Sequence, residues 1–508
     1  MFGRRTQGIH VRDEKNTSDS VPQVLPTPAK VVIPMSMHVG APCTPVVKVG
    51  QEVKLGEPIC APNGLGAPIH ASVSGKVTAI QDLVMPNGAT VPAVVITSDG
   101  TQTVWEGVRP PKVHDLASFT EAVKESGLVG LGGAGFPTWA KLTTGIDTLL
   151  VNGGECEPYC TTGCRTMLDS TEDLLEGARL VKQYIGAKEV IIAIEESAPK
   201  ALAKMEQAVA GLEGFAVKRL PARYPQGAEK MQIFNTTGRV VPEGKLPKDV
   251  GVIVMNVASV AFIAEYLRTG MPLVTKAVTI DGPAVREPKN VIAPVGMAIG
   301  EILEAAGGCK EDPAKVIYGG PMMGGCVASL DFPLLKQNNA FLAFDEKTAR
   351  MPDPTPCIRC ARCVDACPMS LMPVDIAKAY ELQDAQGLMD LHVDLCMECG
   401  ICTYVCPAKR GLAFTNKMAK GFLREYRAKN QEVLLTVSAN PHVRDRATTQ
   451  SIMLDVIIAL VPALVASILL FGVDALLVVL VCVAVAVLAE YIWEKAVKRP
   501  VTISDLSA

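Results

Sequence analysis

Two copies of one cysteine motif limit what this chain can fold into more than any other feature. The motif is C-x2-C-x2-C-x3-C-P, and its cysteines are Cys357, Cys360, Cys363 and Cys367 in the first copy and Cys396, Cys399, Cys402 and Cys406 in the second. Two-residue gaps let three thiolates converge from one tight loop, which is the ligand spacing of a [4Fe–4S] cluster. Structural zinc, the alternative, is bound by pairs of cysteines rather than by this run. The sequence therefore predicts two iron–sulfur clusters.

The cysteine before each proline is predicted to bind the cluster of the other motif. The two motifs resemble those of two-cluster ferredoxins, in which this fourth cysteine crosses over. The first predicted ligand set is Cys357, Cys360, Cys363 and Cys406, and the second is Cys396, Cys399, Cys402 and Cys367.

Composition agrees with metal-bound thiols in a folded protein. The chain has 508 residues, of which 49% are hydrophobic and sixteen are cysteines. A chain of this size does not need disulfides to fold, so the cysteines are expected to be ligands or reactive thiols. A net charge of −3 and an aromatic content of 5% give no basis for nucleic-acid binding, and we expect none.

Changes of pattern along the chain predict a multidomain protein of the α+β and α/β classes. Short apolar runs broken by Gly and Pro indicate a small all-β unit after a polar leader. Alternating strands and amphipathic helices then indicate a mainly parallel sheet, with helices over 171–185, 198–209 and 258–268 and strands over 189–195 and 251–256. The expected domains are a leader at 1–30, the β unit at 31–110, the α/β domain at 111–270, a smaller β-rich module at 271–340, the cysteine segment at 345–430 and a tail at 440–508.

The β unit at 31–110 resembles a biotinyl- or lipoyl-type barrel-sandwich hybrid. That family carries its modifiable lysine at a hairpin tip, where this chain has Ala61–Gly64. The departure removes the swinging-arm function, so a structural role is predicted for this unit.

A glycine-rich loop before a predicted helix is a candidate phosphate site. Its glycines are Gly130, Gly132, Gly133 and Gly135, and the helix is expected to begin near Pro137. Glycines let backbone amides approach a phosphate, and a helix N-terminus adds its dipole. Lys141, about one turn further on, adds a positive charge. By itself, a string of glycines is more often a plain turn.

With the Phe-Pro and the lysine that follow, this loop resembles the FMN-binding loop of the flavoprotein subunit of respiratory NADH dehydrogenase. Later matches follow in order at Asn152–Pro158, Tyr224–Lys230 and Asn256. The resemblance implies that Lys141 and the glycine amides hold the FMN phosphate. It also implies that Asn152, Glu155 and Asn256 lie near the flavin, and that Glu229 lies near the nicotinamide nucleotide.

The acidic segment that begins at Glu155 permits two other interpretations. Glu155 and Glu157 could be a pair of solvated loop acids. Cys156, Cys160 and Cys164 are spaced four apart, which permits a third metal site or a set of redox thiols. Small apolar cysteines without a ligand role are the favoured interpretation.

Residues 1 to about 430 as a whole resemble RnfC, the NADH-side subunit of the Rnf ion-translocating NADH:ferredoxin oxidoreductase complex. The match rests on the cysteine motifs and on Gly8–His10, Gly130–Lys141, Tyr224–Lys230 and Gly319–Gly324. The resemblance implies that the β-rich module is a soluble-ligand-binding β-grasp unit. It also implies that electrons pass between NAD(H), FMN and two [4Fe–4S] clusters, in either direction. Membrane and flavoprotein subunits of the complex would couple this transfer to ion movement, with ferredoxin as a further partner.

Two other functions fit parts of the sequence. A non-catalytic iron–sulfur adaptor subunit would keep the clusters and leave the flavin to another protein of the complex. A ligand-binding scaffold built on the β-rich module would have no need of the clusters, which makes it the weaker alternative. Flavin content, iron content and bleaching by NADH distinguish these functions.

The tail predicts a membrane hairpin. Asp474 is the one charged residue between Val456 and Ala489, and the apolar stretches 452–471 and 475–493 are each long enough to cross a ~30 Å hydrocarbon core. Tyr491 and Trp493 fit an interfacial aromatic belt. Both ends are expected in the cytoplasm, because basic residues flank the hairpin at Arg444, Arg446, Lys495, Lys498 and Arg499. A buried soluble hairpin is the alternative.

This tail resembles the N-terminus of RnfD, a multi-helix membrane subunit of the same complex. The resemblance lies in Asn440–Arg444, Ser451–Asp455 and Pro500–Leu506. We therefore expect an RnfC-like chain fused to a truncated or split RnfD-like segment. The expected location is the bacterial inner (cytoplasmic) membrane, with the soluble domains on its cytoplasmic side.

Overall fold

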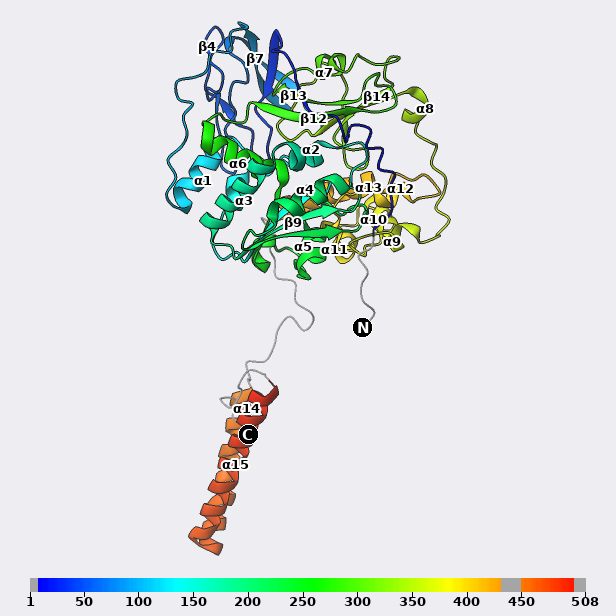
Figure 1. Cartoon of the computed structure of the whole chain (residues 1–508). Helices are drawn as coiled ribbons and strands as arrows, with labels where there is room; N and C mark the ends of the chain where they lie inside the picture. Colours follow the sequence, from blue (N-terminus) through cyan, green and yellow to red (C-terminus); the bar gives the residue numbers. More distant parts are fainter. Residues whose placement is uncertain (1–7, 431–448, 498–508) are drawn as a thin grey trace. The chain divides into compact units, whose positions relative to one another are not determined.

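The computed structural model describes residues 8–430 and 449–497, which belong to two compact units. The large unit ends at Ala428 and the small unit begins at Lys429. The large unit contains four β-sheets, of six, four, four and two strands, and a helical cysteine segment, whereas the described residues 449–497 of the small unit are helical (Figure 1).

The β unit is a sandwich of short antiparallel strands. Its main sheet has the order β2 (Lys30–Pro34), β7 (Thr90–Ser98), β6 (Gly75–Val84) and β4 (Glu52–Val53), and β3 (Thr44–Pro45) pairs with β5 (Cys60–Ala61). The tip that lacks the modifiable lysine is held against its neighbours. The side-chain amide of Asn63 donates to the Pro42 carbonyl at 2.7 Å, and the Trp139 indole donates to the Gly66 carbonyl at 2.8 Å.

A four-stranded parallel sheet forms the core of the α/β domain. Its order is β10 (Phe215–Leu220), β9 (Glu189–Glu195), β8 (Thr148–Gly153) and β11 (Val252–Asn256). Its helices are α1 (Leu116–Glu125), α2 (Thr162–Asp169), α3 (Thr171–Ile185), α4 (Pro199–Val209), α5 (Glu229–Thr237) and α6 (Val257–Thr269). The five elements expected here from hydrophobic periodicity are confirmed, because their apolar residues form the buried face between helices and sheet.

The leader and the β-rich module share one mixed sheet. Its order is β1 (Gln23–Val24), β13 (Lys289–Pro294), β12 (Thr275–Asp281), β16 (Ala340–Phe344), β14 (Lys315–Tyr318) and β15 (Gly325–Cys326), with α7 (Ile299–Ala305) packed against it. The leader therefore supplies an edge strand, and the last central strand runs to Phe344, beyond the expected boundary at 340. Ile33 and Ile96 of the β unit pack in the same hydrophobic core as Phe341, so the two β-rich modules are not separate globules.

The cysteine segment is built from two copies of one loop and turn. Arg359 and Ala361 in the first copy have φ angles of 56° and 60°, and Glu398 and Gly400 in the second have 58° and 81°. Left-handed backbone at the same two positions curls each loop so that its cysteines face inward. One short helix follows each loop, α9 (Arg362–Asp365) and α12 (Ile401–Tyr404). The other helices of this part of the chain are α8 (Glu346–Ala349), α10 (Pro373–Glu381), α11 (Ala385–Asp390) and α13 (Leu412–Asn430).

The small unit is a pair of long apolar helices that contact each other. α14 (Thr449–Phe471) and α15 (Val473–Val497) are joined at Gly472 (Figure 1). The stretches Met453–Phe471 and Val473–Val497 are long and apolar enough to cross a membrane, with mean hydropathies of 2.6 and 2.8, and neither is buried over its most apolar part. Their length and apolarity are those expected of the membrane hairpin. Among the expected features, Arg444, Arg446, Lys498, Arg499, Asn440–Arg444 and Pro500–Leu506 lie outside the described residues.

Candidate functional site

Four cysteines converge on one enclosed cavity in the cysteine segment. Cys367 comes from the first motif, and Cys396, Cys399 and Cys402 come from the second. This is the second predicted ligand set, including the cysteine expected to cross over. No group of His, Cys, Asp and Glu in residues 8–430 and 449–497 is compact enough to hold a single metal ion. The C-x2-C-x2-C-x3-C-P runs that supply these thiols are the ligand pattern of a [4Fe–4S] cluster rather than of structural zinc.

Electrostatic coupling between the thiols follows the same grouping. Burial raises the pKa of Cys399 to about 11 and that of Cys402 to about 12, and both thiols also interact with Cys367. Burial raises the pKa of Cys363, which interacts with Cys406 of the other motif and with Cys357. Such thiols ionise only with a cation among them, since bound metal supplies the charge that burial withholds.

The first predicted ligand set lies at the surface of the large unit. Cys360 is exposed, Cys357 and Cys406 are half-buried, and Cys363 is buried. An open depression of about 740 Å³ beside Cys406 is lined partly by Arg362, Tyr404 and Lys409. The two motifs therefore place one ligand set in the interior and the other at the surface.

The glycine loop has the features of a phosphate cradle, but no α-helix follows it. The prediction of an α-helix that begins near Pro137 is wrong, because only one 3-10 turn forms, over Thr138–Lys141. The β-branched Thr143 and Thr144 and the following Gly145 disfavour its extension. A helix dipole therefore contributes nothing here.

Backbone amides remain available at the turn of the glycine loop. Gly130 donates to the Phe136 carbonyl at 2.8 Å and Gly135 to the Gly130 carbonyl at 3.2 Å, which closes the loop. In the described part of the chain, the amides of Gly132, Gly133 and Ala134 have no hydrogen-bond acceptor. Gly133 has a φ of 114° and open space where a Cβ would lie. Three successive free amides at an open turn fit an anionic group such as a phosphate.

Lys141 and Glu229, predicted at opposite ends of the cofactor site, form an ion pair. The Lys141 ammonium lies 2.7 Å from Oε1 of Glu229 and also donates to the Val254 carbonyl at 2.9 Å. A lysine has three N–H donors, so one is left for a ligand. Glu229 is the first residue of α5, whose start fixes the carboxylate beside the sheet.

Asn152 and Asn256 are paired at the carboxyl ends of two adjacent parallel strands, β8 and β11. Asn256 caps α6 by accepting from the Ala258 amide at 2.9 Å, and a Cβ on Gly132 would lie 3.0 Å from its side-chain nitrogen. Asn152 accepts from the Gln232 side chain at 2.6 Å and donates to the Gly227 carbonyl at 2.9 Å. Ligands of open α/β sheets bind outside this strand edge.

The two acids of the acidic segment are engaged rather than solvated. Glu155 accepts from the amides of Gly163 and Cys164 at 2.8 and 3.0 Å, so it caps α2. Glu157 accepts from the Met322 amide at 3.0 Å, while its Oε1 has no partner among the described residues. Burial raises the pKa of Glu157 to about 7. The interpretation of both as solvated loop acids is therefore wrong.

The three cysteines spaced four apart in the acidic segment pack in three different places. Cys156 contacts the hydrophobic cluster around Tyr224, Cys160 is fully buried in the cluster of Ile317, and Cys164 borders the main core of the α/β domain. This packing fits the favoured interpretation, in which the three cysteines are small apolar residues without a ligand role, and that interpretation stays a prediction.

Tyr224 joins the α/β domain to the interior cysteine site. Tyr224, which is 2% exposed, donates its hydroxyl to the Cys399 carbonyl at 2.7 Å. Around this bond, Cys156 and Met322 pack against Cys399 and Ile401. Cys156 also accepts a hydrogen bond from the Gly227 amide at 3.2 Å. Cys156 therefore serves as packing between the glycine-loop site and the interior ligand set.

Three lysines that support the candidate flavin site were not identified from the sequence. The half-buried Lys15 contacts the acidic segment, the buried Lys276 donates to the Leu131 carbonyl at 3.4 Å, and the buried Lys336 donates to the Gly127 carbonyl at 2.8 Å. Burial lowers the pKa of Lys276 and of Lys336 to about 8. A lysine that directly follows an apolar run, as Lys336 follows Leu334–Leu335, is the sequence signal that indicates such a buried lysine.

Family models match five segments of the chain. The Nuo51 FMN-binding domain covers residues 123–265, the 4Fe-4S dicluster domain 356–409 and the SLBB domain 277–324. The RnfC barrel sandwich hybrid domain covers 4–101, and the NQR2, RnfD, RnfE family covers 436–508. The FMN-binding model includes the glycine loop, and the dicluster model includes all the motif cysteines.

Curated relatives match most of the large unit. The RnfC protein of the Na⁺-translocating ferredoxin:NAD⁺ oxidoreductase complex of Acetobacterium woodii is 39% identical over 380 residues, which are 73% of this chain and 86% of that protein. Its counterpart in the proton-translocating complex of Clostridium ljungdahlii is 39% identical over 375 residues, which are 72% and 82%. A solved NAD⁺-reducing [NiFe]-hydrogenase covers 65% of this chain and 64% of its own at 20% identity, with a TM-score of 0.45, too low for comparing site geometry.

Proposed function

Because this chain belongs to the RnfC family of ion-translocating ferredoxin:NAD⁺ oxidoreductase complexes, we propose that it is the NADH-side electron-transfer subunit of such a complex. Its cofactors are FMN and two [4Fe–4S] clusters. When bound, FMN exchanges electron pairs with NADH and single electrons with the clusters, which joins the two kinds of transfer.

The observation that carries this proposal is the direct contact between the two candidate sites. Tyr224 lies in the segment expected beside the nicotinamide nucleotide, and its hydroxyl bonds to the backbone of Cys399, a proposed cluster ligand. Cys156 of the acidic segment packs at the same point. A flavin held by the α/β domain therefore has a short protein path to the interior cluster.

We assign roles to the residues of the cofactor site from their contacts. The free amides of Gly132, Gly133 and Ala134, with the third donor of Lys141, hold the phosphate. Asn152, Glu155 and Asn256 shape the strand edge where the flavin binds. Glu229 orients Lys141 and lies on the side of the nucleotide.

The two ligand sets then act in order. The interior set, Cys367, Cys396, Cys399 and Cys402, is nearer the flavin site because Cys399 contacts Tyr224. The surface set, Cys357, Cys360, Cys363 and Cys406, exchanges electrons with a partner protein, since Cys360 is exposed.

The membrane role of the chain follows from its small unit. α14 and α15 have the length and apolarity of membrane spans, and their match to the NQR2, RnfD, RnfE family supports membrane association. We propose that they anchor the chain in the bacterial inner membrane, with the large unit on the cytoplasmic side. We propose that partner subunits of the complex couple the electron transfer to ion movement.

Anaerobic purification with flavin extraction, iron assay and NADH titration tests the proposal. We expect one FMN and about eight irons per chain, with bleaching of the flavin absorbance by NADH. Eight irons without flavin, and no response to NADH, would identify the iron–sulfur adaptor instead. The FMN-binding match and the free amides of the glycine loop favour the flavin-bearing form.

A further inference from the structure

The N-terminal leader is bound tightly against the acidic segment of the candidate flavin site. Ile9 pairs with Tyr224 through two backbone hydrogen bonds of 3.0 and 2.9 Å. Further along, the Tyr159 amide donates to the Asp13 carbonyl at 2.9 Å. The leader therefore touches both segments that resemble flavin- and nucleotide-binding loops.

Lys15 makes the most concentrated set of contacts in the leader. Its ammonium donates to the main-chain carbonyls of Glu155, Glu157 and Cys160 at 2.7, 2.7 and 2.5 Å. These three bonds use all three N–H donors of a lysine. One side chain thus fixes the path of the backbone over six residues of the acidic segment.

The surroundings of Lys15 favour its charged form. Burial alone would lower the pKa of Lys15, but the carboxylates of Glu155 and Glu195 and the nearby thiols outweigh burial, so the pKa is raised. The ammonium is therefore charged throughout the physiological range. A charge removed from water costs free energy unless it is compensated, and the three carbonyls supply the hydrogen bonds that the ammonium needs.

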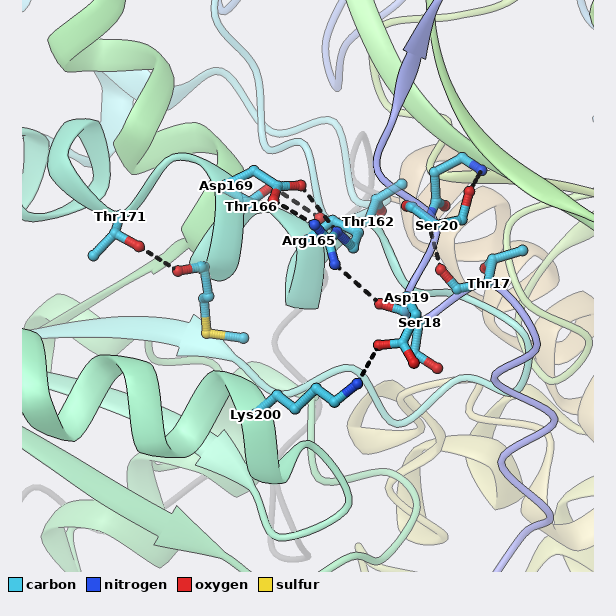
Figure 2. Close-up of polar contacts among 12 residues, drawn as sticks. Thr17, Ser18, Asp19, Ser20, Thr162, Arg165, Thr166, Asp169, Thr171 and Lys200 are labelled. Carbon is cyan, nitrogen blue, oxygen red and sulfur yellow. Dashed lines mark hydrogen bonds and ion pairs between the residues drawn. The ribbon is translucent and has the colours of Figure 1, made fainter.

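Further contacts hold the leader on the C-terminal side of Lys15 (Figure 2). Arg165 of α2 donates to the Ser18 carbonyl at 3.3 Å, and the Lys200 ammonium of α4 lies 2.5 Å from the Asp19 carboxylate. Thr17, which is fully buried, lies 2.6 Å from Thr161 between their hydroxyl oxygens. The residues that follow Lys15 are therefore held in place by contacts with the α/β domain, and these contacts keep Lys15 at the acidic segment.

We infer that Lys15 is a positioning residue of the flavin site, contributed by the leader from outside the FMN-binding domain. It sets the backbone of the acidic segment so that this segment and the glycine loop face one cofactor. The inference rests on the proposed function. It adds that the FMN-binding domain, matched over 123–265, cannot form its site with full affinity without residue 15.

Binding of FMN to the flavin-depleted full chain tests the inference. Lys15→Met keeps the length of the side chain and removes its charge and donors, whereas Lys15→Arg keeps both the charge and the donors. Lys200→Met is the matched control, because it removes another lysine that holds the leader, but one whose side chain is 70% exposed. We expect K15M to weaken FMN binding at least tenfold, with K15R and K200M within threefold of wild type.

Two readouts separate positioning from general stability. Amide hydrogen exchange over 155–160 should rise in K15M and stay unchanged in K200M, while iron content stays at the wild-type level in both. Wild-type affinity in K15M overturns the inference, and so does a loss of affinity with unchanged exchange over 155–160. Failure of the wild-type chain to bind FMN would instead contradict the proposed function.

A measurement on the unmodified chain keeps the inference testable if K15M does not fold. Coupling between two sites is reciprocal, so bound FMN must stabilise the contacts of Lys15. We expect FMN to slow tryptic cleavage after Lys15 several-fold in the wild-type chain. An unchanged cleavage rate at saturating FMN contradicts the inference.

Discussion

At the scale of single residues, two buried titratable groups lie on the segments around the candidate flavin site. Glu157 and Glu195 are buried carboxyl groups, and burial raises their pKa values to about 7 and about 8. Each has one carboxylate oxygen without a partner among the described residues. Natural proteins retain such groups at functional sites more often than in ordinary cores.

The buried carboxyl groups predict that the large unit becomes less stable as the pH rises from about 4.5 to 8. In this window the unfolded carboxyls have lost their protons while the folded ones keep them, so the folded state binds more protons and stability falls with pH. The shifts correspond to about 3 kcal/mol for Glu157 and about 5 kcal/mol for Glu195. The pKa values of the buried Lys276 and Lys336 are lowered to about 8, so these lysines affect the pH dependence of stability only above this window. We expect Glu195→Gln to flatten the dependence of the thermal midpoint on pH, and exposed Glu213→Gln to leave it unchanged.

Lys141 is predicted to contribute to FMN retention but not to iron binding. Lys141→Ala removes a donor from the phosphate site, and a hydrogen bond to a charged group contributes about 1.5–3 kcal/mol. We expect a ten- to hundredfold rise in the Kd for FMN, measured by fluorescence, at constant iron content. Lys188→Ala, at a side chain that is 83% exposed, is the control. Equal loss of flavin and iron in K141A would indicate misfolding and contradict the assigned role.

At the scale of elements, the two cysteine loops differ in how closely the rest of the protein approaches them. Ala361 and Gly400 occupy the same left-handed position in the two copies, with φ angles of 60° and 81°. The alanine shows that this conformation tolerates a side chain. Gly400 differs because a Cβ there would lie 2.6 Å from the Met322 carbonyl oxygen. Position 400 therefore requires glycine because Met322 of the β-rich module lies so close, and not because of the backbone angle.

Substitution of Gly400 is predicted to disturb one cluster and spare the other. In Gly400→Ala, the new methyl group must push the interior cysteine loop away from Met322. We expect about half of the iron to be lost, with the remaining cluster still reducible when followed by EPR. Gly411→Ala is the control, because nothing lies within 4 Å of its added Cβ. Full iron content in G400A would show that the loop can shift without losing its ligands.

At the scale of the whole molecule, the chain joins a large redox unit to an apolar helical unit. The large unit ends at Ala428, and its leader, β unit and β-rich module each contact the α/β domain through a hydrogen bond. The helices α14 and α15 expose their apolar side chains, among them Leu469 and Leu470 at 80% and 77%. Such exposure over two helices suits a lipid environment.

Removal of the small unit is predicted to release the large unit from the membrane. A chain that ends at Asn430 should appear in the soluble fraction when expressed without partner proteins, and the full chain should sediment with membranes. FMN and iron per chain should be equal in the two forms, because every proposed ligand precedes residue 430. A full-length chain that stays soluble without detergent would contradict the assignment of α14 and α15 as membrane spans.

The sequence by itself determined the features that depend on neighbouring residues. The helix Thr171–Ile185 and the strand Glu189–Glu195 have the bounds that their periodicity predicts, and the spacing of the cysteines within each motif predicts a [4Fe–4S] cluster site. Both signals are local, because side-chain direction repeats within a few residues of a helix, strand or tight loop. The α-helix expected near Pro137 does not form, because Thr143, Thr144 and Gly145 disfavour extension of the 3-10 turn over Thr138–Lys141.

Only the tertiary structure decided how distant segments complete the candidate sites. Lys15 reaches Glu155, 140 residues away, and Tyr224 reaches Cys399 across 175 residues. Neither contact leaves a periodic trace in the sequence, because each joins two loops whose approach depends on the packing of whole sheets. The cysteine motifs therefore identify the clusters from the sequence, while the route from the flavin site to the clusters, and the residues that hold it, follow from the fold.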